Sequence, residues 1–226
     1  MNSVVDVDRV QELIEAVDRA DSADALLEAV EDLAAVASEA AIPTLIAVLG
    51  YNNPGAAVAA VDGLIALGEA AVPSLLQQID DYNYGARAWA IRALAGIGDT
   101  RALELLLTAA NNDFSLSVRR AAARGLGNLR WYQLSSDEIS NAQARVLQAL
   151  LLAAARDGEW VVRYAAVMAL QHLAATAETS QPETLACLLE QLQQSAYNDS
   201  VLAVRARAQL ALERIETSEI SLKAHE

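Results

Sequence analysis

The fold is decided by a short stretch that recurs along the chain, Arg87-Ala88-Trp89-Ala90-Ile91-Arg92-Ala93-Leu94. Four similar segments align with it when each is anchored on its last leucine, and they end at Leu64, Leu126, Leu170 and Leu212. Successive anchors lie 30, 32, 44 and 42 residues apart. Such periods are typical of repeat proteins in which each unit is a helical hairpin that buries its apolar face against its neighbours. The sequence therefore predicts an all-α fold, a right-handed α-solenoid.

The segments between the anchors complete this pattern. We expect two N-terminal helices, at about 7–20 and 22–37, followed by five hairpins. The longer spacings predict longer first helices or inserted turns, and no segment alternates with period two for long enough to indicate a strand. Residues 1–216 are thus predicted to form a single repeat domain, with a polar C-terminal tail at 217–226.

A second periodic signal pairs an aspartate with an arginine six residues later. Since the aspartate falls in the turn of a hairpin, its carboxylate can accept hydrogen bonds from the first amides of the second helix. The arginine, in the first turn of that helix, can pair with an aspartate of the same or the adjacent repeat. This pattern favours a structural role for these arginines over a ligand-binding one. The four pairs are Asp81 and Arg87, Asp113 and Arg119, Asp157 and Arg163, and Asp199 and Arg205.

Composition excludes several classes of protein. The chain is 54% hydrophobic but only 4% aromatic, which favours helices packed through small side chains. The single cysteine, Cys187, excludes an internal disulfide and a cysteine-based zinc cluster, and its apolar neighbours predict a packed core thiol. No metal ligands stand at a useful spacing, so no metal site is expected. Low cysteine usage predicts a cytoplasmic protein.

The uncharged run Ala40–Val61 reaches the length of a membrane span. It is interrupted in its middle by Gly50–Gly55, so we expect two short buried helices joined by a turn, and no membrane span. Residues 1–10 lack the apolar core of a signal peptide.

Charge is distributed unevenly along the chain. The net charge of −14 argues against a nucleic-acid partner, because nothing offsets phosphate repulsion over the whole molecule. Residues 1–40 carry eleven acids and two arginines, whereas residues 84–131 carry seven arginines and three acids. An acidic end and a basic middle can orient a charged partner or hold a small anion. The alternative is that these are simply the solvated charges of helical surfaces.

Three longer stretches, Gly50–Ala57, Tyr82–Leu94 and Ser117–Trp131, resemble the HEAT-like phycobilin lyase family of cyanobacteria. Within this family the chain is similar to the smaller, F-type subunits, and the resemblance runs from about residue 10 to 215. It implies a stack of HEAT-like hairpins that acts as a heterodimer with an E-type partner subunit. It also implies that phycocyanobilin, an open-chain tetrapyrrole, is bound as substrate and not as a cofactor.

The same resemblance implies a reaction. The two subunits together would assist formation of a thioether between ring A of the bilin and a cysteine of the acceptor, the phycocyanin alpha-subunit. The nucleophile is then on the acceptor protein. Relatives that also isomerise the bilin carry an adjacent His-Cys pair, whereas here His172 precedes Leu173 and Cys187 follows Ala186, so no isomerase activity is expected.

Aromatic residues gather where a bilin site is expected. Most of them fall in the predicted turns within hairpins or in the first turns of second helices, and equivalent turns of stacked repeats share one edge. Interleaved arginines can pair with the two propionates of a tetrapyrrole that stacks on the aromatic rings. The candidate bilin-binding residues are Tyr82, Tyr84, Arg87, Trp89, Arg92, Phe114, Arg119, Arg120, Arg124 and Trp160.

Other interpretations of these aromatics remain open. They can cover the ends of hairpins or dock the partner subunit, for which the acidic N-terminal helices and the C-terminal hairpin are further candidate surfaces. The alternative function is a non-catalytic HEAT-repeat adaptor that binds phycobiliprotein subunits during phycobilisome assembly or disassembly. A generic interaction scaffold is a third reading. The sequence marks no catalytic residue.

Overall fold

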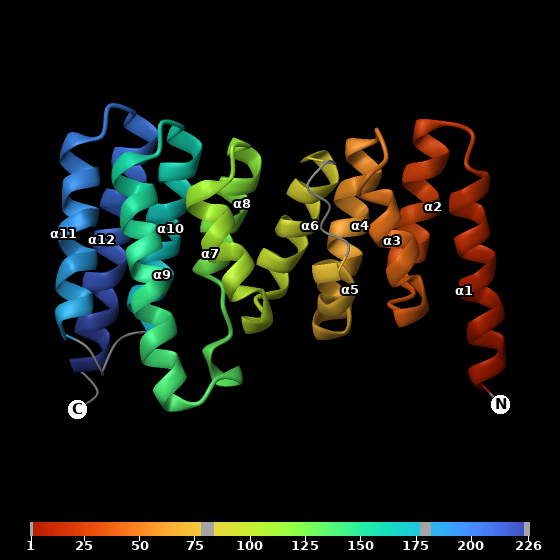
Figure 1. Ribbon diagram of the computed structural model, residues 1–226, viewed down its shortest axis with the longest axis horizontal. Helices are drawn as coiled ribbons and strands as arrows, with labels where there is room; N and C mark the ends of the chain where they lie inside the picture. The colour runs from red at the N-terminus through yellow and green to blue at the C-terminus, as the bar shows by residue number, and fades with distance from the viewer. Residues whose placement is uncertain (1, 78–83, 177–181, 224–226) are drawn as a thin grey trace. The chain divides into compact units, whose positions relative to one another are not determined.

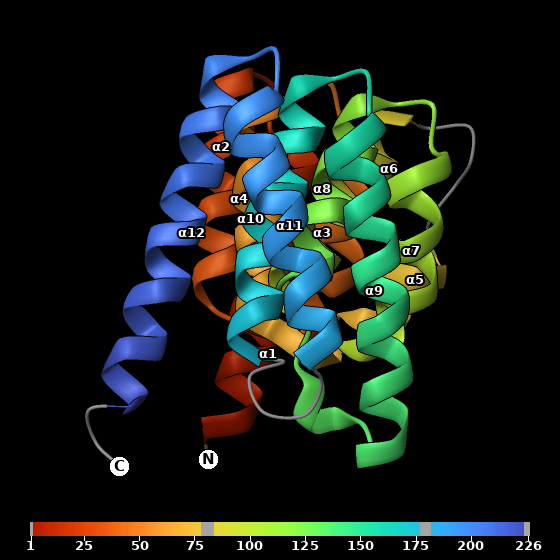
Figure 2. The same cartoon turned by 90° about the vertical axis from the view of Figure 1, so that its left-hand side faces the viewer.

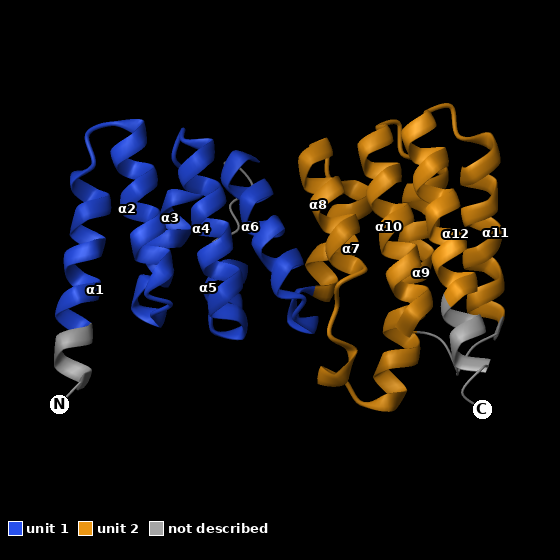
Figure 3. Cartoon of the chain, turned by 180° about the vertical axis from the view of Figure 1, so that it is seen from behind, with its two compact units in different colours: residues 1–102 blue, residues 103–226 orange. Residues whose placement is uncertain are grey.

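The computed structural model describes residues 2–77, 84–176 and 182–223, and side chains over 7–77, 84–176 and 183–217. Every regular element in these ranges is helical, as the repeat predicts. The chain divides into two compact units, residues 1–102 and 103–226 (Figure 3). The prediction of a single domain over residues 1–216 stays a prediction, and each unit is described by itself.

Unit 1 begins with two helices and continues with two hairpins (Figure 1). The helices α2, α4 and α6 pack side by side in one layer, and α3 and α5 lie in a second layer against them. The α-helices are α1 (Asn2–Arg19), α2 (Ala23–Ala35), α3 (Ile42–Val48), α4 (Pro54–Leu67), α5 (Val72–Gln77) and α6 (Tyr84–Ile97). Three 3-10 turns accompany them, η1 (Glu39–Ala41), η2 (Gly68–Ala70) and η3 (Thr100–Ala102).

Unit 2 consists of three hairpins in two layers. The first helices, α7, α9 and α11, pack in one layer and the second helices, α8, α10 and α12, pack in the other. Figure 2 shows each first helix of this unit to the right of the second helix of its hairpin. The elements are α7 (Leu103–Asn112), α8 (Leu116–Leu126), η4 (Trp131–Gln133), α9 (Ser136–Arg156), α10 (Trp160–Thr176), α11 (Pro182–Asn198) and α12 (Leu202–Lys223). The described residues thus contain the five expected hairpins.

The spacing of the anchor leucines follows from these elements. The step of 44 residues contains the inserted turn η4 and the 21-residue helix α9. α12 continues to Lys223 and so includes residues 217–223 of the segment expected to be a polar tail. The uncharged run Ala40–Val61 forms α3, a turn and the start of α4, as expected. No described helix is long and apolar enough to cross a membrane.

The core is built from the recurring leucines and alanines. Leu64, Leu94, Leu126 and Leu170 are fully buried, whereas Leu212 in the last hairpin is only half-buried. This difference has a simple cause, because no further described hairpin packs over α12. Truncating a leucine in such a core typically costs about 2–5 kcal/mol.

Two glycines allow second helices to approach closely. A Cβ on Gly63 of α4 would lie 2.7 Å from the Cβ of Ala34 in α2. A Cβ on Gly127, at the C-terminal end of α8, would lie 2.5 Å from the Cα of Ala169 in α10. The backbone of α8 therefore rests directly on α10, and this contact fixes the position of side chains discussed below.

Candidate functional site

The turns within the hairpins of unit 2 share one construction. Asp113, Asp157 and Asp199 each accept a hydrogen bond from the backbone N–H two residues later, at 2.8, 2.9 and 2.8 Å respectively. Each carboxylate thereby orders the start of the second helix, as the aspartate spacing predicted. We call the three turns, residues 113–115, 157–159 and 199–201, the turn edge of unit 2.

Arginines tie neighbouring turns together. Arg119 donates from Nε and Nη2 to the carboxylate of Asp157, at 2.7 and 3.1 Å, and Arg163 donates in the same way to Asp199, at 2.7 and 3.0 Å. In both cases Nη1 donates to the backbone carbonyl of the aspartate in its own turn, at 2.9 Å. The predicted pairing between adjacent repeats is confirmed for these two arginines, and these hydrogen bonds connect the three turns as a continuous ladder.

These ion pairs change the acidity of their partners. The Arg163 guanidinium lowers the pKa of Asp199 below its ordinary value, despite the opposing effect of burial. Burial pushes the pKa of Asp157 upward, but its bonds with Arg119 and the Glu159 amide outweigh this and lower it. Both carboxylates are therefore ionised in the folded protein at neutral pH.

In the first hairpin of unit 1 an asparagine, two residues after the position of the ladder aspartate, links neighbouring helices. Asn53 accepts a hydrogen bond from the Ala56 amide at 3.1 Å and donates to the carbonyl of Ala23 at 2.8 Å, so it links α4 to the start of α2. The aspartate and the arginine of the periodic pattern are both absent from this hairpin. Asparagine can cap a helix and donate at the same time, which is the signal that could have found this link. Asp81 lies outside the described residues.

Apolar side chains stand exposed on the turn edge of unit 2. Phe114 is 66% exposed, Trp160 44% and Tyr197 78%, and Leu116 and Leu202 are exposed beside them. Soluble proteins seldom expose several large apolar groups together without a partner or ligand. The turn edge therefore offers flat apolar surfaces on a rigid, hydrogen-bonded support.

A shallow pocket opens between two of these turns. It has a volume of about 370 Å³, and its lining includes Asn111, Leu152, Gly158 and the ion pair of Arg119 with Asp157. Arg156, in the last turn of α9, adds an exposed positive charge at this pocket. The volume is at the lower end of the range for small-molecule sites.

The structure distributes the predicted site residues between the two units. In unit 1, Tyr84 is exposed at the start of α6, and Arg87 and Trp89 are half-buried on the same helix. The guanidinium of Arg92 lies over the Trp89 ring, 5.2 Å from its centroid, in a cation–π arrangement. Tyr82 lies outside the described residues.

In unit 2, only part of the predicted set lies on the turn edge. Phe114, Arg119 and Trp160 lie there, but the Arg119 guanidinium is occupied by the ladder, which favours its structural role. Arg120 follows it on α8 and is exposed, whereas Arg124 lies at the opposite end of that helix. A bilin contact by any of these residues stays a prediction.

The structure contradicts one further sequence interpretation, which concerns the single cysteine. Cys187 is exposed on α11, so the prediction of a packed core thiol is wrong. The apolar spacing around it was read correctly, but the buried stripe of α11 runs through Leu188 and Leu192, and α11 belongs to the last hairpin. Within the described ranges, no group of histidine, cysteine and acidic residues is arranged to hold a metal ion.

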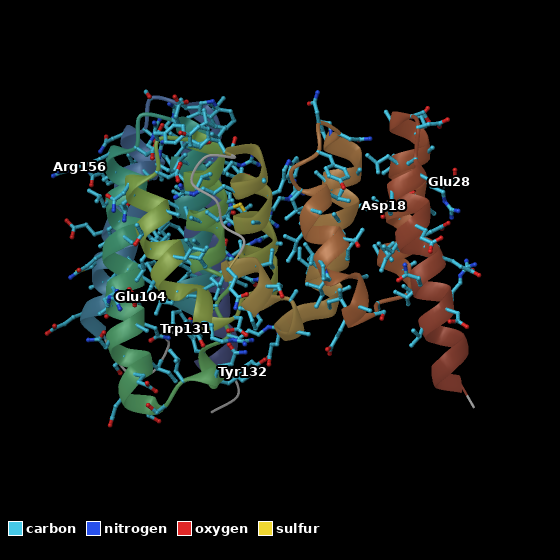
Figure 4. All side chains as sticks on the ribbon, turned by 45° about the vertical axis from the view of Figure 1, so that its right-hand side comes forward. Asp18, Glu28, Glu104, Trp131, Tyr132 and Arg156 are labelled. Carbon is cyan, nitrogen blue, oxygen red and sulfur yellow. The ribbon has the colours of Figure 1, made fainter. Side chains whose placement is uncertain are left out.

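The end of unit 2 opposite the turn edge carries a second pair of aromatics. Trp131 and Tyr132 lie in η4, and Figure 4 shows them at the other end of the unit from Arg156. Tyr132 is exposed and Trp131 half-buried. They are not adjacent to the turn edge, and neither belongs to the candidate bilin-binding residues.

Stacked hairpins with this ladder define a HEAT-repeat protein, and a family model described as HEAT repeats matches residues 72–171. The chain is 52% identical over 217 residues to phycocyanobilin lyase subunit beta of Pseudanabaena tenuis, covering 96% of this chain and 77% of the relative. It is 54% identical over 204 residues to the phycobilisome maturation protein of Synechococcus elongatus, covering 90% and 97%. The chain belongs to the family of phycocyanobilin lyase beta subunits.

A solved structure is similar as well. The structure of the complex of CpcE and CpcF of phycocyanin lyase from Nostoc sp. PCC7120 matches with a TM-score of 0.70 and 52% sequence identity. The match covers 77% of this chain and 99% of the chain in that complex.

Proposed function

We propose that this chain is the F-type subunit of a heterodimeric phycocyanobilin lyase. With an E-type partner it binds phycocyanobilin and assists the formation of a thioether to a cysteine of the phycocyanin alpha-subunit. The observation that carries this proposal is the 52% identity to a phycocyanobilin lyase subunit beta over 96% of the chain. The similarity to a chain of the solved CpcE and CpcF complex supports the pairing with an E-type subunit.

In this proposal the chain acts by positioning its substrate. The thiolate that attacks the bilin belongs to the acceptor protein, so this chain supplies no nucleophile, and phycocyanobilin is substrate, not cofactor. Holding the bilin so that its ring A meets the acceptor cysteine converts an encounter of two molecules into a reaction within one complex. We continue to expect a cytoplasmic location.

The turn edge of unit 2 supports such a role. Trp160 and Phe114 present aromatic faces on which a conjugated tetrapyrrole can stack. The ladder of Arg119 with Asp157 and Arg163 with Asp199 holds these turns in place. A rigid support is what a positioning site requires, because a misplacement of about 1 Å costs much of the rate.

A second candidate function is an adaptor that binds phycobiliprotein subunits without handling the chromophore. It is favoured by one observation, the 54% identity to a relative named phycobilisome maturation protein. In this case the exposed aromatics of the turn edge would dock a protein surface.

Absorption spectroscopy of the purified complex with its E-type partner separates the two functions. If the chain is a lyase subunit, adding phycocyanobilin should give an enhanced and sharpened absorption band, because a bound bilin is held in one conformation. An unchanged spectrum together with tight binding of the phycocyanin alpha-subunit would favour the adaptor and contradict the lyase.

A further inference from the structure

The second helices of unit 2 concentrate positive charge in an otherwise acidic protein. Over residues 116–126, 160–176 and 202–217, these three helices carry seven arginines and two acidic residues, against a net charge of −14 for the chain. Both acids, Glu213 and Glu216, lie on α12, so α8 and α10 contain none. Three of these arginines bond to the turn edge, Arg119 and Arg163 through the ladder and Arg205 through the Asp199 carbonyl at 2.7 Å.

Several contacts connect residues of all three helices beyond the turn edge. The C-terminal end of α8 rests on α10, where Gly127 meets Ala169. His172 of α10 makes a hydrogen bond with the backbone of Gly127. On the other side of α10, Nη2 of Arg207 donates to Oε1 of Gln171, the neighbour of His172, at 2.8 Å.

Arg207 is an unusual residue for such a place. Its side chain is only 6% exposed, and its buried Nη1 has no hydrogen-bond partner. Within the described part of the chain it forms no ion pair, and burial lowers the pKa of its guanidinium. A buried cation without a carboxylate is costly, and such residues persist mainly where a partner is bound at some stage of function.

Further cations surround His172. Burial, followed by the positive charges of Arg207, Arg124 and Arg214, lowers the pKa of this histidine. Arg124 comes from the last turn of α8, and Arg207 and Arg214 come from α12, so the imidazole lies between helices that each contribute positive charge. We call Arg124, His172, Arg207 and Arg214 the His172 cluster.

We infer that the His172 cluster is a binding subsite for a carboxylate, namely a propionate of the bilin. This inference rests on the proposed function and adds residues to it, since the sequence analysis placed the propionates near the turn edge. Arg124 and His172 are exposed and can contact the carboxylate directly, whereas Arg207 is buried. Guanidinium groups suit this role because they bind carboxylates through paired, charge-assisted hydrogen bonds.

A bilin without its negative charges tests this subsite. The complex with the E-type partner is titrated with phycocyanobilin and, separately, with its dimethyl ester, in which both propionates are neutral. We expect the free acid to bind at least about tenfold more tightly than the ester, the range of one hydrogen bond to a charged group. Arg124→Gln and His172→Gln should each remove most of this preference while leaving the affinity for the ester unchanged.

Matched variants complete the experiment. Arg207→Gln is expected to act in the same way, but because Arg207 is buried, the two exposed variants keep the test valid if it fails to fold. Arg19→Gln removes an exposed arginine of α1, which belongs neither to the His172 cluster nor to the turn edge, and should leave both affinities unchanged. The subsite would be overturned if the wild-type complex bound the acid and the ester equally tightly, or if the variants lost affinity for both forms equally. The proposed function would remain in either case.

Two other outcomes are decisive. If the variants weaken association with the E-type partner and not the preference for the free acid, the cluster binds an acidic protein surface and the inference is wrong. If the wild-type complex binds neither bilin form, the proposed function fails and the subsite fails with it.

Discussion

Replacing one aspartate of the ladder tests how the turn edge is held together. Asp199→Asn keeps the shape of the side chain and an oxygen that can still accept from the Val201 amide, which the carboxylate binds at 2.8 Å. It removes the negative charge that receives two hydrogen bonds from Arg163, at 2.7 and 3.0 Å. It also turns an amide group, which donates, toward a guanidinium that can only donate.

The size of the effect follows from the burial of this pair. The Arg163 and Asp199 side chains are 12% and 6% exposed, so the pair is screened far less than a surface ion pair worth about 0–1 kcal/mol. Breaking a fully buried pair costs about 3–5 kcal/mol, but here Arg163 keeps its bond to the Asp157 carbonyl. We therefore expect the free energy of unfolding to fall by about 2–3 kcal/mol.

Thermal unfolding followed by circular dichroism measures this loss. For a chain of this size, 2–3 kcal/mol corresponds to a decrease in Tm of about 5–10 °C. Glu190→Gln is the matched control, because it makes the same charge change at an exposed position of the same hairpin. A Tm of Asp199→Asn within about 1 °C of this control would refute the view that the ladder stabilises the stack.

Three further predictions concern pH, packing and the aromatic pair of unit 1. Arg163 lowers the pKa of Asp199 in the folded protein, so this carboxylate contributes stability above its unfolded pKa of about 4 and loses it as the pH falls through the folded pKa. In urea unfolding between about pH 5 and 2, the free energy of unfolding should therefore fall less steeply with decreasing pH in Asp199→Asn than in the wild type. Parallel pH dependences of the two proteins would contradict this. Gly127→Ala places a Cβ 2.5 Å from the α10 backbone and should lower the free energy of unfolding by about 1–3 kcal/mol in the same assay. Gly158→Ala is the control, because a Cβ there has nothing within 4 Å, and it should be neutral or slightly stabilising. Equal effects of the two substitutions would refute the close approach of α8 to α10. Trp89→Ala and Arg92→Ala should each lower the rate of bilin transfer about tenfold while Tm changes little. Unaltered transfer rates with the partner present would remove this pair from the site.

Much of the fold could be predicted because its determinants are local and periodic. The anchor leucines recur at helical-hairpin spacing, and Leu64, Leu94, Leu126 and Leu170 are all fully buried. The aspartate–arginine spacing also identified the turns, since a cap and its helix are close in sequence. The choice between a partner in the same or the adjacent repeat was left open by the sequence and is decided by the structure in favour of the adjacent one.

Other features depend on packing between repeats and were missed. Arg145 of α9 forms a two-point ion pair with Glu104 of α7, 41 residues away, and no periodic signal marks it. Arg101 binds Asp99 and also the carbonyl of Glu69, a link between two 3-10 turns of unit 1. Such pairs depend on how one helix is rotated against the next, and hydrophobic spacing does not encode that rotation.

The candidate site was harder to predict than the fold. Residue type placed the aromatics near turns correctly, but spacing alone does not say that Arg124 lies at the end of α8 away from those turns. Cys187 was expected in the core because its neighbours are apolar, and a sequence does not reveal which side of a terminal hairpin lacks a neighbour. The His172 cluster combines residues from three helices and could be found only in the folded chain.

The central claim, that this chain is a working subunit of a bilin lyase, is tested most directly by omission. The E-type partner, the phycocyanin alpha-subunit and a source of phycocyanobilin are co-expressed with and without this chain, and covalent bilin is read by fluorescence on denaturing gels. We expect a fluorescent adduct that forms only when this chain is present. An equal amount of adduct in its absence, with the chain shown to be folded, would contradict the lyase function.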